Sequence, residues 1–153
     1  MSILSLAVIC KNGAKTLERC LESIVPHVDE LVFVDNGSTD DSTKIAKKFN
    51  AKIYTSRVID NFAELRNFSF SKCTGDWILW LDVDDVCFNF EKMKQTITEM
   101  PEQLSAVIMP YYYAFDEKGN CIAIHNKERV LRRSRGFQWV NRVHECVNVV
   151  NDF

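Results

Sequence analysis

The stretch WILWLDVDDV, residues 77–86, decides the fold of this chain. Its first five residues are large and apolar, and the stretch is rich in aromatic and β-branched types, which indicates a buried strand of a parallel sheet. Three carboxylates, those of Asp82, Asp84 and Asp85, follow within four positions. Since open α/β sheets bind ligands beyond the carboxyl ends of their strands, we expect the functional site to lie where this strand ends.

The acids at the end of this strand suggest a metal site. Ionised carboxylates this close together repel one another, and burying them is costly unless a cation or strong hydrogen-bond donors compensate. Divalent Mg²⁺ and Mn²⁺ prefer such oxygen ligands and commonly bridge one or two protein carboxylates to substrate phosphates. The sequence therefore predicts a metal-assisted phosphate-handling site. The simpler alternative is that the acids cap the next helix, with Asp85 as the cap of a helix over residues 88–100.

The composition limits the class of protein. A chain of 153 residues with 46% hydrophobic and 11% aromatic residues can bury one substantial core, which predicts a single domain over residues 1–153. The formal charge of −2 argues against a nucleic-acid partner. No apolar run is long enough to span a bilayer. Six cysteines without a C-x-x-C pair indicate reduced core thiols of a cytosolic protein.

Predicted strands and helices alternate over the first two thirds of the chain. The patterns predict strands over residues 3–10, 30–34, 52–55 and 77–81, and helices over 17–24, 42–49, 62–73 and 88–100. Further strands over 106–115, 121–125 and 129–133, the first two joined by a turn at 116–120, indicate a hairpin. We therefore predict an α/β fold, a doubly wound and mostly parallel sheet flanked by helices, with a C-terminal antiparallel extension.

Polar residues follow three of the predicted strands. They are KNG at 11–13, DNGSTD at 35–40 and DVD at 82–84. Each segment alone is ordinary turn chemistry. Together they predict a crevice lined with acids and small residues at one edge of the sheet.

Taken in order, these segments resemble the family-2 glycosyltransferases of the GT-A fold, which has a Rossmann-like sheet and uses nucleotide-diphosphate sugars. The resemblance rests on KNGAKTL at 11–17, VDNGSTDDS at 34–42, DNFAELRN at 60–67 and the D-x-D of Asp82 and Asp84. Val143-His144-Glu145 is similar to a Val-His-Glu that follows the sheet in a glucosyltransferase-like branch of this family. The resemblance implies inverting transfer of a sugar from a nucleotide-diphosphate donor, a UDP-sugar, to an acceptor.

The resemblance also implies roles for individual residues. Asp35 would accept hydrogen bonds from the uracil or ribose, Asp82 would face the ribose, and Asp84 would ligate Mn²⁺ or Mg²⁺ between the phosphates. Arg66 would pair with a phosphate or a site carboxylate, unless it forms a surface ion pair with Glu64 or Asp60. The predicted donor-binding set is Asn12, Asp35, Asp60, Arg66, Asp82 and Asp84.

An inverting transferase needs a base that takes the proton of the acceptor. Members of the family commonly use a carboxylate downstream of the D-x-D, and the only suitable downstream pair here is His144-Glu145. We therefore predict Glu145 and His144 as catalytic residues. The imidazole of His144 is alternatively a metal ligand beside Asp82 and Asp84, and a structural role for the pair is the third interpretation.

Two further groups of residues receive structural interpretations. Five basic residues are interpreted as the solvated face of edge strands, where charge discourages pairing with other chains. They are Lys127, Arg129, Arg132, Arg133 and Arg135. Most aromatic residues after position 110 are expected to pack within the sheet. We expect Trp139, just before the His-Glu pair, to stack against a sugar.

Family members usually carry further helices or a second region after this point. The chain is therefore expected to be truncated at its C-terminus, as the N-terminal catalytic core of such an enzyme or a minimal donor-binding core. The resemblance implies a nucleotide-sugar donor as one partner and a glycan, lipid-linked sugar or peptide as the acceptor. It also implies a cytoplasmic location, with peripheral association at the inner face of the membrane as a further option.

Two other classes of protein share parts of the pattern. An apolar strand ending in D-x-D is also typical of haloacid-dehalogenase-type phosphatases, whose first Asp is phosphorylated. That motif normally opens its domain, whereas three strand–helix units precede it here. The second alternative is a non-catalytic nucleotide-binding module. Phosphate release from a generic monoester would indicate the phosphatase, and metal-dependent nucleotide binding without sugar transfer would indicate the module.

Overall fold

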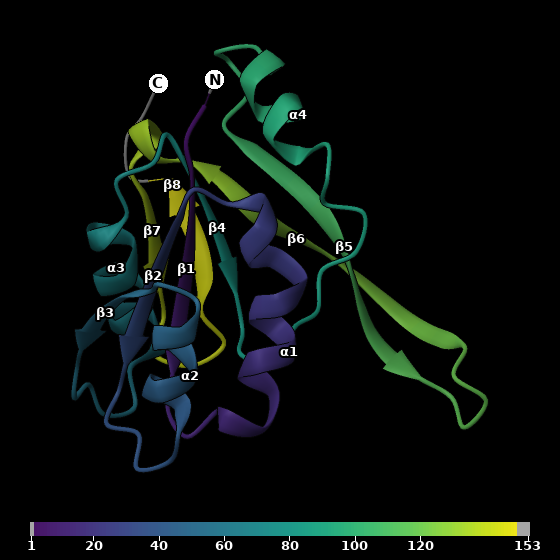
Figure 1. Cartoon of the computed structure of the whole chain (residues 1–153). Coiled ribbons are helices and arrows are strands. Elements are labelled where there is room, and N and C mark those ends of the chain that lie inside the picture. Colours follow the sequence, from purple (N-terminus) through teal and green to yellow (C-terminus); the bar gives the residue numbers. More distant parts are fainter. Residues whose placement is uncertain (1, 150–153) are drawn as a thin grey trace.

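Four parallel strands form the centre of the fold in the computed structural model, which describes residues 2–149. They lie in the order β3-β2-β1-β4, and two antiparallel strands, β6 and then β5, extend the sheet beyond β4 (Figure 1). The six strands are β1 (Leu4–Cys10), β2 (Glu30–Asp35), β3 (Lys52–Thr55), β4 (Trp77–Leu81), β5 (Ala106–Phe115) and β6 (Cys121–Arg132). The mostly parallel α/β sheet with an antiparallel extension is confirmed.

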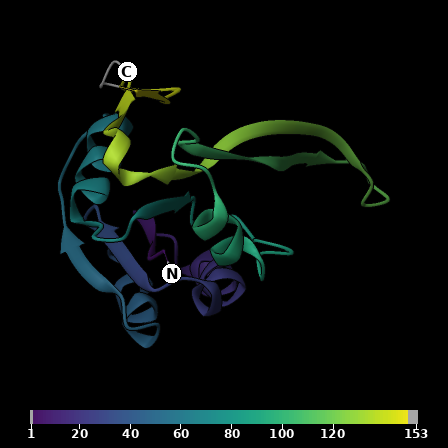
Figure 2. The same ribbon diagram turned by 90° about the horizontal axis from the view of Figure 1, so that it is seen from above.

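Helices cover both faces of the parallel strands. α1 (Ala14–Ile24) and α2 (Ser42–Lys48) lie on one face. α3 (Phe62–Lys72) lies on the other, together with a small antiparallel sheet of β7 (Phe137–Val140) and β8 (Cys146–Val149), as Figures 1 and 2 show. The remaining elements are two short 3₁₀ helices, η1 (Val25–His27) and η2 (Arg133–Arg135), and α4 (Met93–Glu99). The strand order reverses between β1 and β4, which is where such sheets bind ligands.

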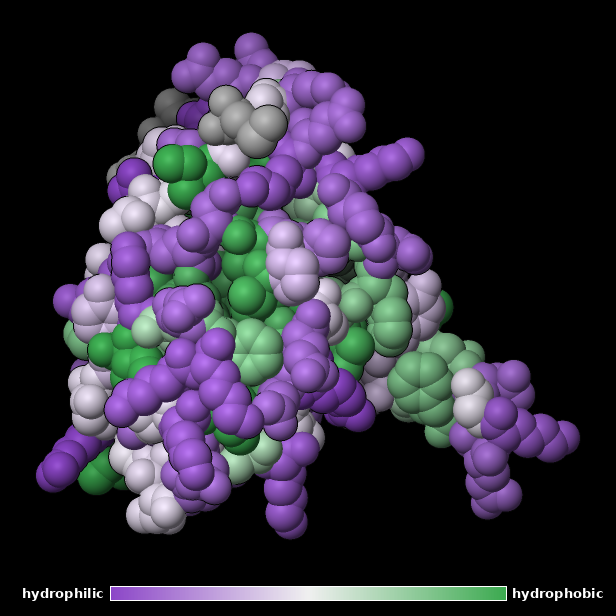
Figure 3. Space-filling model, in the orientation of Figure 1, coloured by the Kyte–Doolittle hydropathy of each residue, from purple (hydrophilic) through white to green (hydrophobic). Residues whose placement is uncertain are grey.

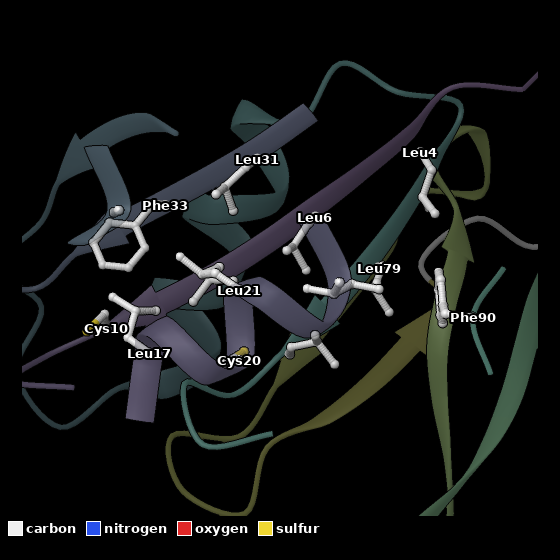
Figure 4. Packing of buried hydrophobic residues seen from close by; sticks show 14 of the residues in the cluster. Leu4, Leu6, Cys10, Leu17, Cys20, Leu21, Leu31, Phe33, Leu79 and Phe90 are labelled. Carbon is white, nitrogen blue, oxygen red and sulfur yellow. The ribbon is translucent and has the colours of Figure 1, made fainter. Parts of the chain in front are cut away.

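The core has two halves, one on each face of β1, because successive residues of a strand point to opposite faces. Leu6 and Val8 belong to the same buried cluster as Leu17 and Leu21 of α1, and Figure 4 shows Leu21 beside Leu6. Ala7 and Ile9, which alternate with them along β1, face the α3 side instead. Each fully buried Leu contributes about 1.5–3 kcal/mol relative to an exposed one, so this two-sided packing fixes the sheet that carries the site.

The β5–β6 hairpin projects from the body of the domain as a long arm (Figures 1 and 2). Figure 3 shows apolar side chains along this arm and a hydrophilic tip. The separate strands expected at 121–125 and 129–133 are one continuous strand, because β6 pairs with β5 from Cys121 to Leu131. The backbone of residues 126–128, which are polar, still pairs with β5, so a break in apolar alternation was a poor guide to a break in the strand.

The helix expected over residues 88–100 is much shorter. α4 covers only Met93–Glu99, with Lys92 as its N-cap, and a right-handed helix cannot run through Asn89, whose φ of 57° lies in the left-handed region. Phe90, just after it, is buried in the core on the α1 side. The interpretation of Asp85 as the cap of this helix is therefore wrong.

All six cysteines are free thiols, but not all lie in the core. Cys10, Cys20 and Cys73 are buried, whereas Cys146 is exposed. Burial raises the pKa of Cys20 and Cys73 to about 12, so these two thiols remain protonated at neutral pH.

Glu30 predicts an acid-dependent loss of stability. Burial alone would raise its pKa, but hydrogen bonds from Lys52, Ser5 and Thr74 outweigh this and lower the pKa from 4.5 to about 2. A lowered folded-state pKa stabilises the fold above pH 4.5, and this contribution is lost as pH falls towards 2. We expect a loss of about 3 kcal/mol in the free energy of unfolding.

The measurement is chemical denaturation at several pH values for the wild-type chain and Glu30→Gln. Other carboxylates titrate in both proteins, so the difference between the two curves isolates Glu30. Parallel curves between pH 4.5 and 2 would show that this carboxylate is not the acid-sensitive group.

Candidate functional site

The turn after β4 gives its three acids three different environments. Asp82 is partly exposed, Asp84 is exposed, and Asp85 is buried at 8% exposure. The Asp85 carboxylate accepts a hydrogen bond from the backbone N–H of Asp82 at 2.9 Å, and the Asp85 N–H donates to the Asp82 carbonyl at 3.1 Å. Two hydrogen bonds between Asp82 and Asp85 therefore hold the turn together. The carboxylate of Asp84 makes no hydrogen bond or ion pair with any residue within 2–149.

Asp85 forms an ion pair with Arg129 of β6 at 2.9 Å, with both side chains below 10% exposure. Burial raises the pKa of Asp85, and the Arg129 guanidinium opposes part of this effect. The interpretation of Arg129 as a solvated edge residue is therefore wrong, since its side chain is buried against the ring of Trp80, 4.0 Å from the ring centroid. A basic residue at a strand edge and one that reaches back into the core look alike in sequence.

Arg66 joins the two predicted catalytic regions. Its Nη2 atom lies 2.6 Å from Oδ1 of Asp82, and its Nε atom lies 2.8 Å from Oε1 of Glu145. The guanidinium lies 4.8 Å from the ring centroids of both Trp80 and Trp139. Of the alternatives for Arg66, the structure has the pairing with a site carboxylate.

The start of α3 is fixed by its own cap, which places Arg66. Asn61 accepts a hydrogen bond from the N–H of Glu64 at 3.1 Å, and its amide donates to the Glu64 carboxylate at 3.1 Å. This local exchange satisfies an N–H at the helix start. It also engages Glu64, one of the two surface partners considered for Arg66.

Trp139 is buried at 5% exposure, so the expectation that it stacks against a sugar is wrong. Its ring packs edge-on against Trp80, with 4.7 Å between the centroids. Asn67 of α3 holds the Trp139 backbone by donating to its carbonyl at 2.9 Å and accepting from its N–H at 2.8 Å. The buried ring of Trp139 therefore packs against the guanidinium of Arg66 rather than facing solvent.

The loops after β1 and β2 are tied to each other. Asn12 accepts a hydrogen bond from the N–H of Thr39 at 2.8 Å, and its own N–H donates to Ser38 at 2.9 Å. Asp35, the last residue of β2, accepts from the N–H of Ser38 with both oxygens, at 3.2 and 3.3 Å. Asn12 and Asp35 thus hold together the loops that follow two neighbouring strands, but neither side chain lines the pocket between these loops and α3.

Gly13 allows these loops to approach the acidic turn. A side chain at this position would place its Cβ 2.9 Å from Sγ of Cys10 and 3.1 Å from Val83. Contacts that short force neighbouring atoms to shift. The loop after β1 and the Asp82–Asp84 turn can therefore lie side by side only because residue 13 has no side chain.

A pocket of about 380 Å³ opens between these loops and the start of α3. This volume is in the range of small-ligand sites. The predicted residues that line it are Asp60, Arg66 and Asp82, and Val83 lines it beside the exposed Asp84. Of its other lining residues, Lys11, Asn36 and Leu65 lie in segments recognised in the sequence but received no individual role, and Val58 and Ile59 lie outside those segments. Asn36 is the clearest omission, because it follows Asp35 directly in a segment already recognised.

The loop between β7 and β8 brings Glu145 to Arg66, which lines this pocket. The N–H of Phe62 donates to the carbonyl of Arg142 at 3.1 Å, and Arg142 donates to the carbonyl of Asp60 at 3.2 Å. Glu145 is half-buried in its pairing with Arg66, whereas His144 is exposed and has a φ of 53°. The two residues of the predicted catalytic pair therefore have different surroundings.

The residues present fit a metal ion that is coordinated mainly by a bound phosphate and by water rather than by protein side chains. Within residues 2–149, no three His, Cys, Asp or Glu side chains lie close enough together to hold an ion by themselves. Asp82, Asp84 and His144 thus do not form a preformed three-ligand site. The free carboxylate of Asp84 and the second oxygen of Asp82 still suit Mg²⁺ or Mn²⁺, which keeps waters and phosphate oxygens as its other ligands.

Comparisons with known proteins agree with this geometry. The family model described as glycosyl transferase family 2 matches residues 5–149. A TPR repeat-containing protein of Synechococcus elongatus is 38% identical over 97% of this chain and 36% of its own length. A glycosyltransferase of Rickettsia typhi is 34% identical over 99% of this chain and 47% of its own length. This chain thus spans between about a third and a half of these relatives.

Solved structures show the same fold. Staphylococcus aureus TarS, which has also been solved in complex with UDP, has a TM-score of 0.54 and 25% identity, over 63% of this chain and 31% of its own. Glucosyl-3-phosphoglycerate synthase from Mycobacterium tuberculosis has a TM-score of 0.56 and 23% identity, over 68% of this chain and 42% of its own, which supports the fold alone. None of the helices within residues 2–149 is long and apolar enough to cross a bilayer.

Proposed function

The chain belongs to glycosyltransferase family 2, and we propose that it binds a UDP-sugar with a divalent metal and takes part in inverting transfer of the sugar to an acceptor. It has the GT-A fold of its structural neighbours. The match over nearly the whole chain favours a glycosyltransferase over the phosphatase alternative.

The observation that carries this proposal is the cluster of Arg66, Asp82 and Glu145, in which Arg66 and Asp82 line the pocket and Glu145 pairs with Arg66. It lies at the carboxyl end of β4, next to the reversal of strand order, where an open α/β sheet receives a nucleotide. In the proposal Asp82 accepts hydrogen bonds from the ribose hydroxyls, and the ion pair with Arg66 fixes the direction of the Asp82 carboxylate. TarS, a neighbour at 25% identity, supports UDP as the nucleotide because it has been solved with UDP.

A metal ion would be held by Asp84 and by the free oxygen of Asp82, together with donor phosphates. Its chemistry would be to neutralise the charge that develops on the departing diphosphate. Glu145 would take the proton of the acceptor hydroxyl, since it is the carboxylate downstream of the D-x-D that Arg66 holds beside Asp82.

A thermal-shift panel tests the donor directly. A ligand that binds only the folded state raises the melting temperature by mass action. We expect UDP and one UDP-sugar with Mn²⁺ to give the largest shifts among nucleoside diphosphates and nucleotide sugars. A larger shift with another base would reject UDP, and equal shifts with and without Mn²⁺ would reject metal assistance.

Asp35→Ala is expected to weaken binding of the nucleoside but not of the diphosphate. Asp35 ends β2, whereas the metal-binding acids follow β4, so the two ends can hold different parts of one ligand. We expect an affinity loss for UDP of about tenfold, or about 1.4 kcal/mol. Calorimetry with UDP and with pyrophosphate, each with Mn²⁺, measures the two parts.

Asp35→Asn is the matched control, because its amide oxygen can still accept from the N–H of Ser38. It separates loss of the loop hydrogen bond from loss of the charge. An equally severe loss of pyrophosphate binding in Asp35→Ala would contradict this division of the ligand between the strands.

A further inference from the structure

A buried ion pair lies directly behind the acidic turn. Asp85 and Arg129 are 2.9 Å apart, with side-chain exposures of 7% and 5%. Removing two charges from water is costly, and apolar residues of similar size often serve stability as well or better. Stability alone is therefore a weak reason for this pair.

The pair holds the backbone on both sides of Asp82. The Asp85 oxygen that pairs with Arg129 also accepts from the N–H of Asp82, and the Asp85 N–H donates back to the Asp82 carbonyl. Arg129 in turn donates to the carbonyl of Trp80 at 3.3 Å. The strand end and the turn are thus fixed to one buried group.

Trp80 connects this pair to the cluster in the pocket. Its ring centroid lies 4.0 Å from the Arg129 guanidinium and 4.8 Å from that of Arg66. Arg129 pairs with Asp85, and Arg66 pairs with Asp82. Each acid is thereby held by its own arginine, and both arginines pack on one indole.

Asp84 depends on this arrangement most. Its carboxylate has no hydrogen bond or ion pair to another residue within 2–149, and only its carbonyl is contacted, by Arg19 at 3.4 Å. The direction of the Asp84 side chain is therefore set by the backbone of the turn. A site that receives a metal needs such directions to be fixed in advance.

We propose that Asp85 and Arg129 are positioning residues that set the direction of the Asp82 and Asp84 carboxylates for a metal-bound nucleotide. Neither side chain needs to touch the ligand. This inference rests on the proposed function, which names the ligand. It predicts that breaking the pair weakens nucleotide binding in a protein that remains folded.

Two double variants test the inference. Asp85→Leu with Arg129→Met removes both charges and the acceptor for the Asp82 N–H, without leaving one buried charge alone. Asp85→Asn with Arg129→Met also removes both charges but keeps an acceptor for that N–H. The measurements are thermal unfolding, hydrogen exchange of the Asp82 amide, and calorimetry with UDP and Mn²⁺.

We expect the leucine variant to unfold cooperatively near the wild-type temperature, to exchange the Asp82 amide at least about tenfold faster, and to bind UDP with Mn²⁺ about tenfold more weakly. The asparagine variant should have an Asp82 exchange rate and a UDP affinity between those of the leucine variant and wild type. A folded leucine variant with wild-type affinity would overturn the inference. Should it not fold, Arg129→Lys takes its place, because Lys keeps the charge but lacks the planar guanidinium that packs on the Trp80 ring.

The two proposals fail in different ways. Absence of UDP binding by the wild-type chain would reject the proposed donor, while exchange of the Asp82 amide still reports on the pair. Unchanged exchange in the leucine variant would reject the positioning role whatever the ligand. Faster exchange together with weaker binding is the result that supports it.

Discussion

Asp84→Ala is expected to abolish metal-dependent binding of UDP while the domain stays folded. The proposed metal would lose the one carboxylate of the turn that has no protein partner within residues 2–149. We expect a loss of affinity of at least about 100-fold in Mn²⁺, or about 2.8 kcal/mol. Because the side chain is exposed, the free energy of unfolding should change by less than about 0.5 kcal/mol.

Calorimetry in Mn²⁺ and in chelator measures this effect, and chemical denaturation checks the fold. Glu117→Ala is a suitable control, since it removes an exposed carboxylate at the tip of the arm, outside the pocket. Equal affinity of the wild-type chain in chelator and in Mn²⁺ would count decisively against a metal at Asp84.

Glu145→Gln is expected to leave donor binding intact while transfer by a complete enzyme falls by about 10²–10⁴-fold. The amide oxygen of Gln can still accept from Nε of Arg66, so the support of the pocket wall is retained. Only the ability to take a proton is lost. Steady-state rates with a complete relative carrying this change, together with the donor affinity of both chains, give the comparison.

A change at His144 separates the remaining interpretations of the pair. His144 has a φ of 53°, so Asn is a better replacement than Ala, because Asn tolerates the left-handed region. If the imidazole ligates the metal, affinity for Mn²⁺ with UDP should fall together with the rate.

An active Glu145→Gln enzyme with an unchanged pH profile would instead reject Glu145 as the base.

The order of strands and helices was largely readable from the sequence. Runs such as WILWL reveal a strand buried on both faces, and the apolar spacing of Leu17, Leu21 and Ile24 reveals a helix, because both patterns repeat within a few residues. The exceptions were the small sheet of β7 and β8, which was not predicted, and two local interruptions. Asn89 shortened one expected helix, and polar residues inside β6 concealed its continuity.

The location of the pocket was also readable, but the contacts around it were not. Acids and small residues at three strand ends had to meet at one edge of a parallel sheet. Asp84 and Asp85 are identical in type and adjacent in sequence, yet one is exposed and the other is buried against Arg129, which lies far along the chain. No pattern near Asp85 indicates that partner.

The sequence by itself determined the α/β class, the edge of the sheet at which the pocket opens and the resemblance to a glycosyltransferase family. Periodicity and strand-end chemistry depend on neighbours within a few residues, so they can be read locally. Only the tertiary structure decided that Arg66 joins Asp82 to Glu145, that Trp139 supports this arginine and that Asp85 faces inward. The partner of a long side chain depends on which segments of the chain lie nearby. Segments far apart in the sequence come close only when the sheet and its helices pack.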